Sequence, residues 1–213
     1  MVSVKWLGHS SFSMGVGDKV IYVDPYEGEY SDKADLVLVT HSHSDHCDPS
    51  KVSRIQKADT LFIAPADCAS KIGHAVKSLK PGETWSVGDI KVQAVEAYNT
   101  KRFRSPGVPF HSKELGVGYL VSVAGKTIYH AGDTDFVPEM KSLRGIYLAL
   151  LPVGGTYTMD SPEAVEATLA IEPDYIIPMH RREASLEVFK KTVEAKSKTK
   201  VIVLAPGETF EVK

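Results

Sequence analysis

A run of four apolar residues at positions 36–39 is followed closely by the segment His41-x-His43-x-Asp45-His46. An unbroken apolar run of this length predicts a buried strand. Side chains two residues apart share one face of an extended segment, so His41 and His43 can bind one ion. A turn in the middle of the segment directs Asp45 and His46 toward a second position. Imidazole and carboxylate ligands in this mixture suit Zn²⁺, Mn²⁺ or Fe, and a polar loop of hydrogen-bonded histidines is the alternative.

The rest of the chain alternates between strand and helix patterns, without low-complexity segments or linkers. We therefore expect one α/β domain that covers residues 1–213. Strands are predicted at 2–7, 12–14, 19–23, 36–39, 61–64, 90–97, 117–123, 127–130, 147–151, 175–177 and 201–204, and helices at 49–58, 66–79, 162–171 and 184–195. Ser161 is the expected N-cap of the third helix, with Pro162 in its first turn. Residues 98–116 show no periodicity, and loops this long inside compact domains are usually functional.

Two segments about half the chain apart are similar to each other. Residues 16–22 align with residues 123–129, and each copy predicts a tight turn between two strands. The strands lead toward an aspartate, Asp24 in one copy and Asp133 in the other. A duplication would imply two β-rich halves that face one another, with helices outside. Convergence of short hairpins on similar turn sequences is the alternative.

The composition excludes several classes of protein. Hydrophobic residues make up 43% and charged residues 24% of the chain, which is too apolar for a disordered protein. No run of about 18 apolar residues could span a bilayer, and the pattern of a secretory signal is missing, so we expect a cytoplasmic protein. Cys47 and Cys68 are too few for a disulfide framework or a four-cysteine zinc site. The formal net charge of −2 argues against a basic protein that coats nucleic acid.

Three isolated residues are placed to complete a site for two metal ions. His111 lies in the long middle loop. Asp133 follows the strand predicted at 127–130, and His180 follows another apolar strand pattern. Strand ends and the loops over a sheet are where an α/β protein forms its site, so we expect these residues to join the histidine cluster.

The order of these residues, with short flanking phrases, resembles the metallo-β-lactamase superfamily. The matching positions are His41, His43, Asp45, His46, His111, Asp133 and His180, with Asp24, the phrase Gly8-His9-Ser10 and the phrase at 154–159. The resemblance covers nearly the whole chain, and the phrases are similar to a small single-domain branch of metal-dependent hydrolases that includes ascorbate-6-phosphate-lactonase-like proteins. It implies a four-layer αββα sandwich of two mixed β-sheets flanked by helices, with the metals at one edge of the sheets. The substrate stays open, because this fold hosts many reactions.

The resemblance also implies how the ligands divide between two divalent ions, with Zn²⁺ expected and Mn²⁺ or Fe as alternatives. The first ion takes His41, His43 and His111, and the second takes Asp45, His46 and His180, with Asp133 bridging both. His130 is the alternative to His111 as third histidine of the first ion. Two ions lower the pKa of a shared water toward neutrality, which yields a bridging hydroxide that attacks the substrate.

Three residues are expected to assist this chemistry. Asp45 is the expected proton shuttle at the nucleophile. Asp24 is expected to accept a hydrogen bond from a ligand histidine and fix its orientation, with a plain Asp-Pro turn as the alternative. His9 is expected to support the site or contact substrate, and an ordinary strand-end histidine is the alternative.

Cations gather in the sequence around two of the expected ligands. The loop that contains His111 also contains Lys101, Arg102, Arg104 and Lys113. His180 is followed by Arg181 and Arg182. Arg102, Arg104 and Arg181 are therefore candidate contacts for a phosphorylated or carboxylated substrate, since guanidinium groups match such anions. Thr156 and Tyr157 add hydroxyl groups. Solvated loop charge is the alternative.

The expected function is that of a hydrolase acting on an ester, lactone or phosphodiester bond of a small anionic molecule. One alternative is a nuclease or phosphodiesterase for RNA or DNA, although the chain lacks a long inserted arm to hold a polynucleotide. Another is an iron-binding redox protein, since iron accepts the same ligands. We expect no membrane partner, and the oligomeric state stays open.

Overall fold

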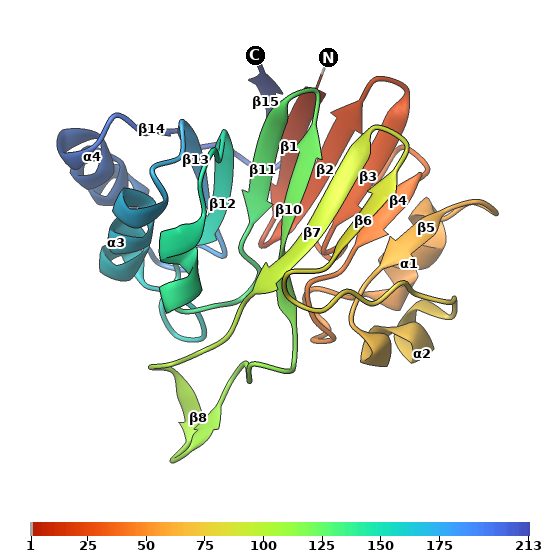
Figure 1. Ribbon diagram of the computed structural model, residues 1–213, viewed down its shortest axis with the longest axis horizontal. Helices are drawn as coiled ribbons and strands as arrows, with labels where there is room; N and C mark the ends of the chain where they lie inside the picture. The colour runs from red at the N-terminus through yellow and green to blue at the C-terminus, as the bar shows by residue number, and fades with distance from the viewer. Residues whose placement is uncertain (1) are drawn as a thin grey trace. The chain divides into compact units, whose positions relative to one another are not determined.

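The computed structural model describes residues 2–213, which form two compact units. Unit 1 comprises the chain up to Lys80 together with Leu204–Lys213, and unit 2 comprises Pro81–Val203. Each unit contains one large mixed β-sheet and its own helices, so the predicted α/β class with two mixed sheets is confirmed (Figure 1). Within residues 2–213, no helix combines the length and apolar character that crossing a bilayer requires.

Unit 1 is built on a six-stranded sheet in the order β15-β1-β2-β3-β4-β5. Its strands are β1 (Val2–Gly8), β2 (Ser11–Val16), β3 (Lys19–Val23), β4 (Leu36–Leu38), β5 (Leu61–Ile63) and β15 (Thr209–Val212). Its helices are α1 (Pro49–Ile55), the 3-10 helix η1 (Ala66–Cys68) and α2 (Ala69–Ile72). β1, β2 and β3 are antiparallel neighbours, whereas β4 and β5 run parallel to β3 because longer crossover segments connect them.

Helix α1 packs against an apolar cluster of unit 1. Asp48 caps the helix, since its carboxylate accepts the backbone N–H of Ser50 at 2.8 Å. The helix buries Val52 and Ile55, which join side chains of β3, β4 and β5 in one buried cluster. Burial of this apolar surface is the main term that stabilises the packing of helix on sheet.

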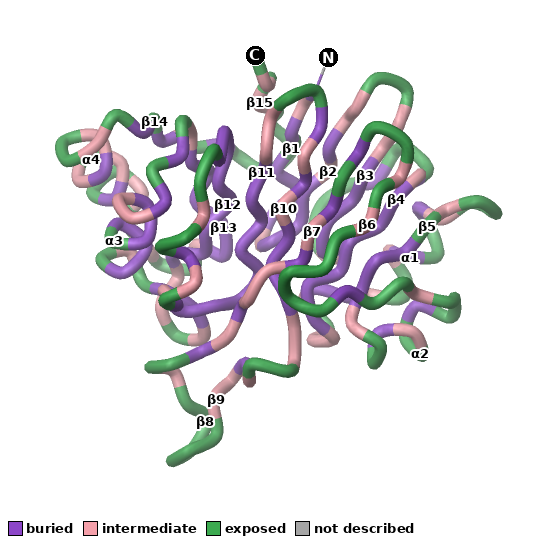
Figure 2. The backbone as a smooth tube through the Cα atoms, in the orientation of Figure 1, coloured by how far each residue is buried: buried purple, intermediate pink, exposed green. Residues whose placement is uncertain are grey.

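Unit 2 is built on a seven-stranded sheet in the order β14-β13-β12-β11-β10-β7-β6. Its strands are β6 (Thr84–Val87), β7 (Ile90–Glu96), β10 (Val117–Val123), β11 (Lys126–His130), β12 (Leu148–Pro152), β13 (Tyr175–Met179) and β14 (Lys200–Val201). Its helices are the 3-10 helix η2 (Pro138–Ser142), α3 (Ser161–Ile171) and α4 (Leu186–Lys196). The hairpin of β8 (Phe103–Ser105) and β9 (Val108–Pro109) extends away from this sheet and is largely exposed, while β12 and β13 are buried (Figures 1 and 2).

The helix predicted at 66–79 is much shorter in the structure. It ends at Ile72, because Gly73 adopts a left-handed φ of 73° that stops the helix. Residues 73–80 form no helix, and Lys77 forms a parallel bridge with Ile63 at the end of β5. Pairing with β5 therefore prevents a helix in residues for which local propensity predicts one.

The start of α3 also differs from the prediction. Its N-cap is Asp160 rather than Ser161, since the Asp160 carboxylate accepts the backbone N–H of Glu163 at 2.9 Å. The sequence patterns do not predict β6, β15 or the β8–β9 hairpin. These strands are two to four residues long, and none of their residues is buried, so they lack the apolar signal of a core strand.

The two units share one order of strand directions. In unit 1, β1, β2 and β3 are antiparallel neighbours followed by parallel β4 and β5. In unit 2, β7, β10 and β11 are followed in the same way by β12 and β13. The similar segments form the β2–β3 and β10–β11 hairpins, with Gly17 and Gly125 at φ of 62° and 73°. The repeat thus holds at the level of topology, and duplication as its origin stays a prediction.

Candidate metal centre

Asp24 organises the loop that carries the histidine cluster of unit 1. It follows β3 with a left-handed φ of 47°, a conformation that costs a non-glycine residue about 1–3 kcal/mol. Its buried carboxylate accepts the backbone N–H and the hydroxyl of Thr40, both at 2.7 Å, and contacts His46 Nδ1 at 2.7 Å. The Asp24 carboxylate therefore connects the end of β3 to Thr40, just before the histidine cluster, and to His46, at its end.

These contacts decide which nitrogen of two histidines carries the proton. A carboxylate only accepts hydrogen bonds, so His46 Nδ1 donates to Asp24. The Thr40 hydroxyl uses its single proton on Asp24, and therefore it accepts from His41 Nδ1 at 3.0 Å. In both rings the proton lies on Nδ1 and the lone pair on Nε2, which is the form that binds a metal through Nε2.

His41 and His43 bring two ring nitrogens together. His41 Nε2 lies 3.0 Å from His43 Nδ1, with the ring centroids 4.7 Å apart. Two nitrogens on one tetrahedral Zn²⁺ lie about 3.3 Å apart, given Zn–N distances of roughly 2.0–2.1 Å. The pair therefore fits two positions of a single coordination sphere.

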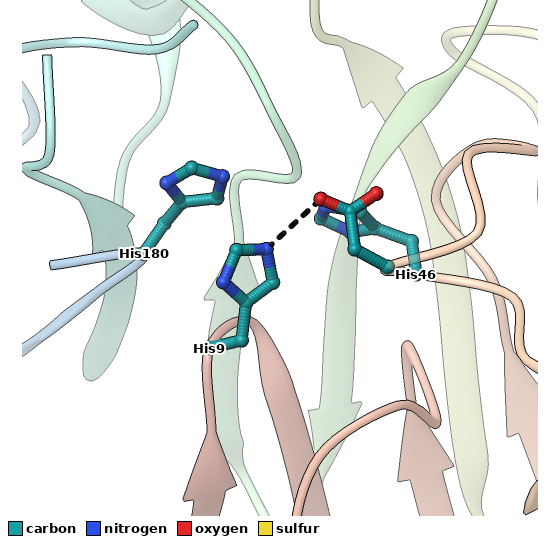
Figure 3. Close-up of side chains that lie close together, drawn as sticks. His9, His46 and His180 are labelled. Atoms are coloured by element: carbon teal, nitrogen blue, oxygen red, sulfur yellow. Dashed lines mark ion pairs between the residues drawn. The ribbon is translucent and has the colours of Figure 1, made fainter. Parts of the chain in front are cut away.

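Asp45 and His9 form an ion pair beside His46. His9 Nε2 lies 3.3 Å from Asp45 Oδ2, the contact drawn as a dashed line in Figure 3. His9 has a left-handed φ of 47°, and its carbonyl accepts the indole N–H of Trp6 at 3.1 Å. Donor atoms of His9, Asp45 and His46 lie within 4.8 Å of one another. The Asp45 side chain is 42% exposed while His46 is fully buried, so this carboxylate can exchange protons with solvent.

The ligands predicted in unit 2 converge on one carboxylate. Asp133 Oδ2 lies 3.5 Å from His111 Nε2 and 3.3 Å from His180 Nε2, and all three side chains are at most 5% exposed. Asp133 follows β11, His111 follows β9, and His180 follows β13 with a left-handed φ of 46°. Strand ends and one strained residue thus bring two imidazoles and a carboxylate to the same point of unit 2.

His130, the alternative to His111, has a different local partner. It ends β11, is fully buried, and its Nδ1 accepts the backbone N–H of Gly132 at 3.2 Å. That hydrogen bond occupies the Nδ1 lone pair and places the ring proton on Nε2. The geometry of unit 2 therefore favours His111 as the histidine that acts with Asp133.

Arg102 directs its guanidinium at three carboxylates of unit 2, and its predicted contact with a substrate stays a prediction. Its Nη1 contacts Glu163 and lies 2.7 Å from Asp135, its Nη2 lies 3.4 Å from Asp160, and its Nε donates to the Gly155 carbonyl at 2.7 Å. Burial lowers the pKa of Arg102, but hydrogen bonds to Glu163 and Asp135 outweigh that effect and raise it overall. Three carboxylates neutralise this cation.

Five other side chains of unit 2 form a row of contacts in which two neighbouring aromatic rings lie between two arginines, and a threonine contacts one of the arginines. The Arg104 guanidinium lies 5.8 Å from the centre of the Phe110 ring, which meets the Tyr157 ring edge-on at 4.7 Å. The Arg182 guanidinium lies 4.8 Å from the Tyr157 ring and donates to the Thr156 hydroxyl at 3.0 Å. We call these five residues the cation–aromatic ladder. It contains three predicted substrate contacts, Arg104, Thr156 and Tyr157.

Arg181, the remaining predicted contact, is half-buried next to His180. Its Nε donates to the Pro178 carbonyl at 2.8 Å. Burial lowers the pKa of Arg181 to about 10, so the side chain keeps its charge at pH 7.

Sequence reasoning missed three residues that support the predicted ligands, namely Thr40, Asn99 and Asp135. Thr40 directly precedes the histidine cluster, and that position could have drawn attention to it. Asn99 hydrogen-bonds His111 from twelve positions away in an unpatterned loop, and no sequence signal marks it. Asp135 lies two residues after Asp133, where its carboxylate has an entirely different set of partners.

Comparisons with known proteins find a matching family and related structures. Residues 3–180 match the family model of the beta-lactamase superfamily domain. A UPF0173 metal-dependent hydrolase of Pyrococcus abyssi is 35% identical, with 100% of both chains covered. A candidate metal-dependent hydrolase from Parabacteroides distasonis superposes with a TM-score of 0.88 at 33% identity, over 95% of this chain and 92% of that one. Igni18, a metallo hydrolase from Ignicoccus hospitalis, superposes with a TM-score of 0.81 at 29% identity, over 100% and 99%.

Proposed function

This chain belongs to the β-lactamase superfamily and to its UPF0173 metal-dependent hydrolases, and from that premise we propose that it hydrolyses an ester, lactone or phosphodiester bond of a small anionic substrate. The observation that carries the proposal is the convergence of His111 Nε2 and His180 Nε2 on one Asp133 oxygen. Buried imidazoles and carboxylates that share one point are the donor set of a metal centre with catalytic chemistry.

The donor set fits divalent ions. His41, His43 and His111 would hold one ion, Asp45, His46 and His180 would hold a second, and Asp133 would be shared by both. The Nδ1 protons of His41, His46 and His111 are directed to oxygen partners, which leaves Nε2 of each ring for an ion. Zn²⁺ suits this mixture of nitrogen and oxygen ligands, and Mn²⁺ and Fe also accept it. When bound, such ions supply the positive charge that polarises the scissile bond and activates water.

Asp45 is the side chain that we propose for proton transfer. Its carboxylate is 42% exposed and lies 3.3 Å from His9 Nε2, so a proton can pass from this pair to solvent. We propose that Asp45 accepts the proton released by the attacking water and that His9 orients the carboxylate. Asp24 has a separate task, since its buried carboxylate holds His46 directly and His41 through Thr40.

The cation–aromatic ladder supports an anionic substrate. Its two guanidinium groups belong to Arg104 and Arg182, and its Phe110 directly precedes His111. Unlike Arg102, neither arginine pairs with a carboxylate among residues 2–213, so each can bind a phosphate or carboxylate. The faces of Phe110 and Tyr157 offer apolar surface for the remainder of such a molecule.

The test is a substrate screen with defined metal content. The purified protein is stripped with a chelator, reloaded separately with Zn²⁺, Mn²⁺ or Fe²⁺, and assayed against aryl esters, lactones, phosphodiesters and RNA. We expect hydrolysis of a small anionic substrate only after reloading, and its loss in Asp133→Ala.

The matched control is Asp89→Ala, which removes an exposed carboxylate from a turn of the same unit. It should keep full activity. Full activity of Asp133→Ala would contradict the proposed ligand set, and a preference for RNA over every small substrate would contradict the proposed substrate class.

A further inference from the structure

We propose that Asn99 is a positioning residue for metal binding, which fixes the ring of His111, and that Asp135 and Arg102 hold Asn99 in place. The inference rests on the proposed function in that His111 is taken as a metal ligand. It goes further because it gives a role to three polar side chains of unit 2 that take no part in the proposed reaction.

The hydrogen bonds of Asn99 decide the orientation of its amide. Nδ2 lies 3.0 Å from Asp135 Oδ1 and 2.9 Å from the Tyr157 carbonyl oxygen. Both of these atoms only accept, so the NH₂ group of Asn99 must face them. The side-chain oxygen therefore faces His111, where it also accepts the backbone N–H of His111 at 2.8 Å.

This orientation fixes the proton of His111. Asn99 Oδ1 lies 2.9 Å from His111 Nδ1 and has no proton to give, so Nδ1 carries the proton and donates. The lone pair then lies on Nε2, the atom that faces Asp133 at 3.5 Å. Because the same oxygen binds both the backbone and the ring of His111, the ring cannot turn without losing a buried hydrogen bond.

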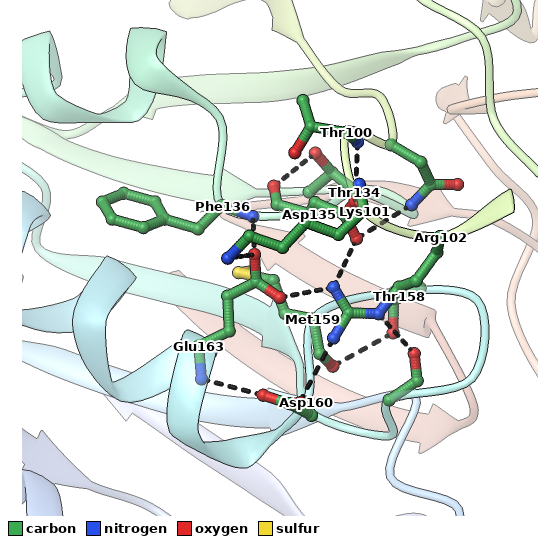
Figure 4. Close-up of polar contacts among 12 residues, drawn as sticks. Thr100, Lys101, Arg102, Thr134, Asp135, Phe136, Thr158, Met159, Asp160 and Glu163 are labelled. Atoms are coloured by element: carbon green, nitrogen blue, oxygen red, sulfur yellow. Dashed lines mark hydrogen bonds and ion pairs between the residues drawn. The ribbon is translucent and has the colours of Figure 1, made fainter. Parts of the chain in front are cut away.

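Asp135 anchors Asn99 from the other side. Its fully buried carboxylate accepts the backbone N–H groups of Thr100 and Lys101, both at 2.6 Å, and the Arg102 guanidinium at 2.7 Å (Figure 4). With the Asn99 amide this makes four donors on one carboxylate. A buried carboxylate with this many donors forms a rigid support, because each lost donor would leave a charge poorly solvated.

Arg102 extends the support to α3. Its guanidinium joins Asp135 to Glu163 in the first turn of the helix, and its Nε binds the Gly155 carbonyl (Figure 4). The backbone N–H of Phe136 donates to Glu163 at 3.1 Å and strengthens the same cluster. The arginine therefore fastens the start of the loop that ends at His111, and this explains why so polar a group is only 14% exposed.

The experiment compares two substitutions at one position. Asn99→Leu removes the acceptor for His111, whereas Asn99→Asp keeps an oxygen acceptor, and both remove the amide donor to Asp135. Zn²⁺ affinity is measured by competition with a chromogenic chelator. The His111 tautomer is measured by ¹⁵N NMR of the metal-free protein.

We expect Asn99→Leu to weaken Zn²⁺ binding by about 10–100-fold and to convert His111 to a mixture of tautomers. Asn99→Asp should keep the Nδ1–H form of His111 and lose less Zn²⁺ affinity than Asn99→Leu, although its second carboxylate oxygen faces Asp135 without a hydrogen bond. Thr100→Val, an exposed neighbour whose backbone N–H still binds Asp135, should behave as the wild type in both measurements.

An equal loss of affinity in Asn99→Leu and Asn99→Asp would overturn the inference, because a purely structural role predicts it. A His111 tautomer that is unchanged in Asn99→Leu would also overturn it. His111→Ala tests the underlying premise separately: if that variant binds Zn²⁺ as tightly as the wild type, His111 is not a ligand and the proposed function itself fails at this residue.

Discussion

Asp24 and His46 form a fully buried pair in which the carboxylate oxygen and Nδ1 lie 2.7 Å apart. The amide of Asp24→Asn cannot accept from His46, Thr40 N–H and the Thr40 hydroxyl together, so one donor loses its partner. We expect unfolding free energy to fall by about 1–3 kcal/mol and metal affinity to fall about 10–100-fold. Urea unfolding and chelator competition measure the two effects. Wild-type metal affinity in this variant would show that Asp24 does not orient His46.

Asp45→Asn tests the proposed proton transfer. The amide keeps the size and one oxygen of the side chain but cannot take up a proton. We expect kcat to fall by about 10²–10⁴-fold at equal metal occupancy, with a much smaller change in KM. Steady-state kinetics on the substrate found in the screen, with metal content measured for each sample, decides this. An unchanged kcat would remove Asp45 from the chemistry.

Arg102→Leu should damage the fold rather than substrate recognition. The substitution leaves Asp135 and Glu163 buried without their shared cation, which typically costs about 3–5 kcal/mol. Thermal unfolding should therefore shift to clearly lower temperature, while KM of the surviving native protein stays close to that of the wild type. A raised KM with normal stability would instead support a substrate contact.

Arg104→Glu and Arg182→Glu should impair substrate binding and leave the stability of the fold unchanged. Both arginines lie in the cation–aromatic ladder, so reversing their charge repels an anionic substrate. We expect KM to rise with little change in kcat or thermal stability, and the effect to weaken with added salt. Lys198→Glu makes the same charge change at an exposed site elsewhere in the unit and should leave KM unaltered. Equal KM values in all three variants would contradict an anionic substrate.

Asp35 should make stability depend on pH in the acid range. Burial raises the pKa of its carboxyl, but hydrogen bonds from Lys57 and from the Val20 backbone N–H outweigh that effect and lower it overall. A folded-state pKa below the unfolded value of about 3.9 stabilises the fold above that value, and the benefit disappears as pH falls through the folded-state pKa. Asp35→Asn should therefore lose about 1 kcal/mol at pH 7 and little near pH 2. Urea unfolding of both proteins at the two pH values checks this, and an equal difference at both would contradict the coupling.

The local patterns of the sequence determined where most of the strands lie and where the histidine cluster at 41–46 is found. The apolar run before His41 forms the buried β4, and the segments at 16–22 and 123–129 form matching hairpins. These predictions hold because burial and tight turns depend on residues that are close in sequence. The same reasoning failed beyond Ile72, where pairing of Lys77 with Ile63 prevents a helix.

Only the tertiary structure decided what the isolated polar residues do. The sequence places Arg102 and Arg104 two positions apart in one loop, yet three carboxylates from distant segments neutralise the first, whereas the second lies over an aromatic ring. Likewise, the partner of each Nδ1 is what distinguishes His111, the predicted ligand, from its alternative His130. A charge or an imidazole takes its role from the groups that desolvate it and bond to it, and in a folded chain those groups come from far along the sequence.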